Sequence, residues 1–102
     1  MNKTAMKTNV IQLEPHDDIV SIKDKMTWRT CRRIILVWPK RGRILKNELE
    51  LELLRRAANS LGAELVLVTH HAVVREWAEG TKVPAFGSIP AAQKNDGNAA
   101  GL

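Results

Sequence analysis

Two short apolar runs, separated by an amphipathic segment, constrain the fold most. The first run, RIILVWP, spans residues 33–39, and the second, ELVLVT, spans 64–69. Runs of this length, rich in β-branched residues and apolar at consecutive positions, are typical of parallel strands that are buried on both faces. Between them an apolar stripe with helical spacing starts after Asn47 and stops before Gly62, which are preferred residue types at the start and end of helices. A strand, a helix and a second strand in this order predict a parallel β–α–β unit.

The same alternation extends to both sides of this unit. VIQLE at 10–14 has the pattern of a short strand, and a helix follows it, with Asp17 or Asp18 as its cap. AVVREWAE at 72–79 predicts a short helix, and VPAFGS at 83–88 predicts a last short strand. The chain therefore predicts a small three-layer α/β sandwich, Rossmann-like or flavodoxin-like, with a parallel sheet of about four strands and helices on both faces. The order of the strands does not follow from the sequence.

The length of 102 residues allows one domain. We expect residues 10–90 to form this single α/β domain and residues 1–9 to form a disordered tail. Residues 91–102 are mostly small and polar, which predicts a second disordered tail. Aromatic residues make up only 4% of the chain, so the core must consist mainly of Leu, Ile, Val and Ala.

The cysteine count and the hydropathy pattern bear on the compartment. Cys31 is the only cysteine, which excludes an intramolecular disulfide and any zinc motif built from several cysteines. No apolar run approaches the ~20 residues that a membrane span needs. The first residues lack the apolar segment of a signal peptide. These features predict a cytoplasmic protein without a membrane span.

The formal net charge of +5 is concentrated in one part of the chain. Between residues 23 and 46, Asp24 is the only acid among a run of cations: Lys23, Lys25, Arg29, Arg32, Arg33, Lys40, Arg41, Arg43 and Lys46. Such a cluster can bind nucleic acid by neutralising phosphates if its members share one surface. They fall on a predicted helix, on the segment after it and on a loop at the opposite edge of the sheet, so one surface is not required. No nucleic-acid-binding motif is present.

The segment RIILVWPKRGRIL, followed by LELELLRRAANSLGAELVLVTHHAVVREWAEGTKVPAFGS, resembles a known kind of domain. It is similar to a Rossmann-like α/β domain found near the N-terminus of uncharacterised bacterial proteins, many of which continue into membrane or extracellular segments. The matching features are the strand that ends in proline, the Leu-Leu-Arg-Arg helix, the strand ending in Val-Thr, Arg75 in the next helix and the Val-Pro-x-Phe motif, over roughly residues 10–93. The resemblance implies the fold and no particular activity. Where the relatives tend to have Asp-Pro after Val-Thr, this chain has His71-Ala72, which weakens any role for an acid at that turn.

Candidate site residues gather in the loops that follow the predicted strands. In open parallel sheets, ligands bind beyond the carboxyl ends of the strands. Three loops, with the sequences PHDD, PKRGRILKN and THH, should meet there. They carry the candidate ligand-binding residues His16, Asp17, Asp18, Lys40, Arg41, Arg43, His70 and His71.

Several kinds of chemistry find little support in these loops. His16, one aspartate and either of the two adjacent histidines could offer metal ligands, but one aspartate is needed as a helix cap and adjacent histidines on a turn usually point apart. We therefore expect no metal site. Phosphotransfer would need an aspartate at the end of a later strand, where this chain has WP and TH. The basic loop has no G-x-G-x-x-G or Walker pattern, and Glu48, Glu50 and Glu52 in the following helix would repel a phosphate, so no cofactor is expected.

The sequence therefore predicts a non-catalytic interaction or regulatory module with a protein partner. Two alternatives stay open. One is the binding of nucleic acid or of a phosphate-bearing ligand through the basic Lys40–Arg43 loop. The other is a hydrolase or metal-dependent enzyme at the carboxyl edge of the strands, although an enzyme is not the expected outcome. The sequence does not predict the oligomeric state.

Overall fold

A computed structural model describes residues 8–28 and 31–93 of the chain. Four strands alternate with three helices, and a short helical turn at 89–93 follows the last strand. The elements are β1 (Thr8–Gln12), α1 (Ile19–Met26), β2 (Arg33–Val37), α2 (Glu48–Ser60), β3 (Glu64–Val68), α3 (Ala72–Thr81) and β4 (Ala85–Phe86). The predicted alternation of strands and helices is confirmed over this part of the chain.

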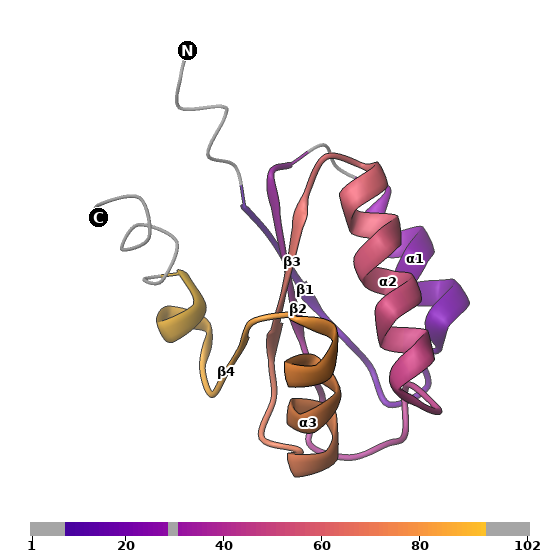
Figure 1. The fold of residues 1–102 in the computed structure, drawn as a ribbon, viewed down its shortest axis with the longest axis vertical. Helices are drawn as coiled ribbons and strands as arrows, with labels where there is room; N and C mark the ends of the chain where they lie inside the picture. The colour runs from indigo at the N-terminus through magenta and orange to yellow at the C-terminus, as the bar shows by residue number, and fades with distance from the viewer. Residues whose placement is uncertain (1–7, 29–30, 94–102) are drawn as a thin grey trace.

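All four strands run parallel in one sheet, in the spatial order β1-β2-β3-β4. Each crossover thus moves to the next strand in the same direction. Right-handed crossovers of this kind place their helices on one face of the sheet, and α1, α2 and α3 all lie on that side (Figure 1). The main core forms there, where Ile34 and Leu36 of β2 and Leu67 of β3 pack among the buried helix residues.

The opposite face of the sheet has a thinner cover. Ile35, Val66 and Val68 form a second, smaller core with Ala92, and Ile89 packs against it. Figure 1 shows the helical turn that carries these two residues on the side away from the three helices. The predicted small α/β sandwich with four parallel strands is confirmed; its three helices lie on one face, and the short helical turn at 89–93 covers part of the other.

Helix α2 begins and ends close to the predicted signals. The Asn47 side chain accepts the N–H of Glu50 at 3.1 Å. The Glu50 carboxylate accepts the N–H of Lys46 at 2.8 Å, one residue before the N–H that a capping box would use. At the other end Gly62 takes a φ of +78°, which is the left-handed conformation that favours glycine after a helix.

Several predicted boundaries move, and β4 covers only Ala85–Phe86 of the strand predicted at 83–88. Strand β1 starts at Thr8, inside the predicted tail. Residues 91–93, also placed in a tail, are helical because Ala92 is fully buried against the sheet. Helix α3 continues through Gly80 and ends at Thr81, with Lys82 in the left-handed conformation at a φ of 64°. The rest of both predicted tails lies outside the described residues.

Within the described ranges, no helix is both long enough and apolar enough to cross a membrane.

Candidate functional site

The three loops at the carboxyl edge of the sheet do meet. Gly42, in the loop after β2, lies against the loop after β1, so that a Cβ at this position would come within 3.0 Å of the Pro15 Cα. Its φ of +108° also favours glycine. On the other side, His71 stands at the start of α3, and its Nε2 atom lies 3.1 Å from the Pro39 carbonyl oxygen. The loops after β1, β2 and β3 therefore form one continuous edge.

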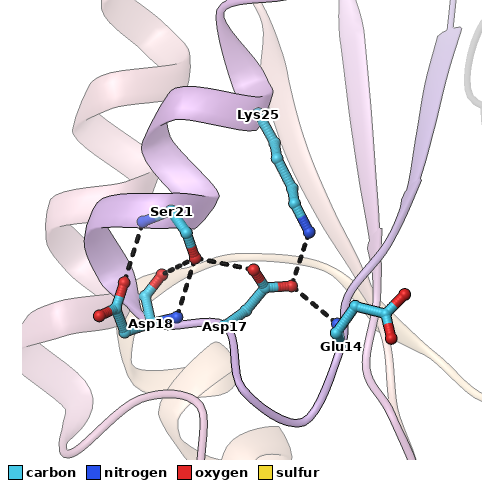
Figure 2. Close-up of polar contacts among 5 residues, drawn as sticks. All are labelled: Glu14, Asp17, Asp18, Ser21 and Lys25. Atoms are coloured by element: carbon cyan, nitrogen blue, oxygen red, sulfur yellow. Dashed lines mark hydrogen bonds and ion pairs between the residues drawn. The ribbon is translucent and has the colours of Figure 1, made fainter.

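Asp17 is held by its own loop and by α1 (Figure 2). Its side chain is buried, with the residue 4% exposed. Its carboxylate accepts three hydrogen bonds, each 2.7 Å long, from the Glu14 backbone N–H, the Ser21 hydroxyl and the Lys25 ammonium group. Burial by itself raises the pKa of the Asp17 carboxyl, but the hydrogen bonds from Glu14, Lys25 and Ser21 outweigh burial, and the net pKa is lowered. Asp17 is a charged link between the loop and the helix.

Asp18 caps α1. Its side chain accepts the Ser21 N–H at 2.9 Å, and the Ser21 hydroxyl oxygen accepts the Asp18 N–H at 3.0 Å, which completes a reciprocal capping box (Figure 2). Both aspartates therefore serve the start of α1, although the sequence required only one of them. Neither has a hydrogen bond to a histidine among the described contacts.

The two adjacent histidines separate. Because a carbonyl oxygen only accepts hydrogen bonds, the Nε2 atom of His71 donates to Pro39. His70 is exposed and lies beside the loop after β4, where a Cβ on Gly87 would sit 3.3 Å from its Cε1 atom. In the part of the chain that the structure describes, no three His, Cys, Asp or Glu side chains are grouped so as to hold a metal ion.

Two open cavities lie on this edge. One, of about 520 Å³, has Gln12, Pro39, Lys40 and His70 among its lining residues. The other, of about 320 Å³, has these lining residues: Trp38, Gly42, Arg43, Ile44, Leu45, Lys46, His71, Val73, Val74 and Trp77. Trp38 and His71 line both cavities, so the two adjoin.

The loop after β2 carries exposed cations that have no ion pair with any described residue: Lys40, Arg41, Arg43 and Lys46. Elsewhere in the described ranges some cations are paired with acids, whereas the exposed Lys23, Arg32 and Lys82 also have no ion pair with a described residue. Arg55 and Arg56 bind the Glu52 carboxylate at 2.6 and 2.9 Å, and their hydrogen bonds, that of Arg55 first, lower the pKa of Glu52 to about 2. Unpaired positive charge thus gathers beside the smaller cavity.

The strand order affects the shape of this edge. In doubly wound sheets the strand order reverses, so neighbouring crossovers leave on opposite faces and open a crevice that binds ligands. The order β1-β2-β3-β4 contains no such reversal. The carboxyl edge is accordingly a surface with open cavities: Val37 and Val68 of the smaller core line the larger cavity, and Ile44, Leu45 and Val74 of the main core line the smaller one.

Some residues of this surface were not predicted from the sequence. Trp38 and Trp77 line the smaller cavity, and Arg75 donates to the Thr69 carbonyl oxygen at 3.2 Å. Trp38 had a usable signal, since it directly follows a buried strand. No sequence signal placed Trp77 or Arg75 on this surface, because a helical pattern predicts which residues face the core and not which neighbouring loop they contact. Cys31 is buried in the main core.

Comparisons with models of protein families, with curated proteins and with solved structures find no match to this chain. What the structure supports is a small α/β fold with a parallel sheet, which is compatible with the Rossmann-like description.

Proposed function

We propose that this chain is a non-catalytic interaction module that docks an acidic segment of a partner protein on the carboxyl edge of its sheet. The observation that carries the proposal is the set of four exposed cations without ion pairs, Lys40, Arg41, Arg43 and Lys46, beside a cavity with apolar and aromatic walls. The family resemblance supports only the fold, and no activity is inferred from it.

The cavity suits an anchor side chain. At about 320 Å³ it is near the lower end of the range of ligand pockets, ~300–1,000 Å³, so it has room for little more than one or two side chains. Protein interfaces commonly depend on one apolar or aromatic anchor in such a pocket, surrounded by polar contacts. Arg43 and Lys46 line the cavity and would meet carboxylates that flank the anchor.

The charges around the cavity favour an acidic partner. Each exposed charge pair contributes only up to ~1 kcal/mol, but complementary charge speeds association and selects among partners. Helix α3 starts at the cavity with no acid in its first turn. Of the two acids in the first turn of α2, Glu50 already accepts a backbone hydrogen bond from Lys46 and Glu48 lies against Gly80 of α3.

Nucleic acid or a phosphate-bearing ligand is the second candidate, because the same cations would attract phosphates. Stacking of bases needs an accessible aromatic face. Trp38 is only 7% exposed and Trp77 is half-buried, whereas the exposed Trp28 lies beside β1. The enzyme alternative has less support, because Asp17 and Asp18 are held by α1 and the adjacent histidines separate.

A titration with labelled probes tests the proposal. The probes are a short Glu- and Asp-rich peptide with a central Leu-Phe pair, the same peptide with Gln and Asn in place of the acids, and a single-stranded oligonucleotide. We expect the full chain to bind the acidic peptide most tightly by fluorescence anisotropy at physiological salt. Replacing Arg43→Gln and Lys46→Gln together should weaken binding roughly tenfold, since each contact contributes up to ~1 kcal/mol.

A matched control removes the same amount of charge elsewhere. Lys23→Gln with Arg32→Gln changes two exposed cations that line neither cavity, and should alter the affinity less than twofold. Equal losses in both double variants would mean that only net charge matters and would overturn the proposed site. Tighter binding of the oligonucleotide than of the peptide would promote the second candidate.

A further inference from the structure

The two edges of the sheet differ in their capacity to pair with another strand. An exposed edge strand presents unpaired N–H and C=O groups, and proteins usually protect it with charges, proline or short length. Strand β4 is protected, because it has two residues and Pro84 directly precedes it. Strand β1 has five residues, TNVIQ, with no charge, proline or glycine, and among the described strands it pairs with β2 alone.

One hydrogen bond shows which residues of β1 turn their backbone N–H and C=O groups towards β2. The Leu13 N–H donates to the Val37 carbonyl oxygen of β2 at 2.9 Å. Because successive residues of a strand point their backbone groups to opposite sides, Ile11 also turns its N–H and C=O to β2. The backbone groups of Thr8, Val10 and Gln12 therefore point outward from the open edge.

Beside this edge lies an open groove of about 530 Å³, lined by β1 together with Lys25 and Trp28. Trp28 is 68% exposed and Val10 is 38% exposed. The Lys25 ammonium group is engaged by Asp17 at 2.7 Å. The groove thus combines unpaired backbone groups with exposed apolar side chains, and its one charged group is already neutralised.

We infer that a second copy of this chain occupies the open edge, with its β1 antiparallel to the first and Val10 opposite Val10 across a two-fold axis. The three outward residues are symmetric about Val10. In this register each Val10 exchanges N–H···O=C bonds with its counterpart, and Thr8 does the same with Gln12 of the second copy. Every outward N–H and C=O group of the strand then has a partner.

Charge also favours the second copy as the occupant. The uncharged strand places no like charges opposite one another. The antiparallel arrangement directs the two carboxyl edges in opposite directions, which keeps the two basic loops apart. The other edge of the sheet, at β4, is protected, so no further chain can add there. The assembly therefore closes as a dimer and does not extend into a filament.

Sedimentation equilibrium of the full chain over a range of concentrations tests this inference. We expect the mass to rise towards twice the 11.4 kDa of one chain as the concentration increases. The variants Val10→Lys and Val10→Glu each place like charges opposite one another in the dimer, and each should raise its dissociation constant roughly fivefold or more. An equimolar mixture of the two variants should restore dimers, because Lys then faces Glu.

A wild-type measurement keeps the test independent of the variants' folding. On dimerisation the amide exchange of Val10 and Gln12 should slow with rising concentration, whereas that of Ile11, already bonded to β2, should stay unchanged. A chain that remains monomeric, with exchange independent of concentration, would overturn the inference. So would variants that dimerise as well as the wild type, or a mixture that fails to recover dimers. None of these outcomes depends on the acidic partner proposed above.

Discussion

The role of Asp17 gives the sharpest stability prediction. Replacing Asp17→Ala removes the acceptor of three hydrogen bonds, and a net contribution of ~1.5–3 kcal/mol for each charged hydrogen bond would suggest a very large loss. The expected loss of stability is smaller than this sum, because two of the three donors keep other partners. The Lys25 side chain is 21% exposed and can turn to water, and the Ser21 hydroxyl retains the Asp18 backbone as a partner. The Glu14 N–H is left without its acceptor, so we expect a loss of about 2–3 kcal/mol in the free energy of unfolding.

The variant Asp17→Asn separates hydrogen bonding from charge. Asparagine can still accept from the Glu14 N–H but loses the ion pair with Lys25, so we expect a smaller loss of about 1–2 kcal/mol at neutral pH. The pKa of Asp17 is lower when folded than its ordinary value of 3.8. The stabilising effect of the carboxylate is therefore fully present above that value and is lost as the pH falls through the lowered pKa. The difference between wild type and Asp17→Asn should shrink below pH 3.8.

Urea unfolding of the wild type and both variants, followed by circular dichroism from neutral to acidic pH, measures these differences. A loss below ~0.5 kcal/mol for Asp17→Ala, the scale of an ordinary surface substitution, would refute the structural role. A difference that does not change at low pH would refute the role of the charge. Unchanged stability with loss of acidic-peptide binding would place Asp17 in the docking surface instead.

Three further stability predictions follow from packing. Leu54→Asp should leave the domain unfolded by circular dichroism, because the fully buried site would receive an unpaired charge. Gly42→Ala should lower the free energy of unfolding by about 1–2 kcal/mol, because its φ of +108° is strained for alanine and Pro15 leaves no room for a Cβ. Gly80→Ala should instead stabilise by up to ~1 kcal/mol, because alanine favours the helix and the only obstructing group is the flexible carboxylate end of Glu48; a thermal midpoint that falls in this variant would contradict the reasoning.

The elements of the fold that follow from the sequence are those with a local cause. The consecutive apolar residues of β2 and β3 predict buried strands, and Asn47 and Gly62 mark the ends of α2, because caps act within a few residues. The helical turn at 89–93 has no local signal, because the small residues around Ala92 show no periodicity and only Ala92 among them is fully buried, through contact with the far face of the sheet.

The parts that sequence reasoning missed depend on contacts across the chain. Strand order is decided by how helices pack on the sheet, and no local pattern records it. The loops of the carboxyl edge meet, as expected of parallel strands, but the contacts of the candidate residues in them are set by distant partners. The His71 ring is held by Pro39 in the loop after β2, and the Asp17 carboxylate is bound by Lys25, eight residues further along the chain. Residue types alone could not separate these structural roles from ligand binding.

The most direct test of the docking surface is a ¹H–¹⁵N NMR titration of the full chain with the acidic peptide. We expect shift changes confined to the loop at 40–46, the start of α3 and the indole signals of Trp38 and Trp77, and their loss in the Arg43→Gln, Lys46→Gln double variant. Shift changes centred on β1 or on α1, or a titration that persists unchanged in the double variant, would contradict it.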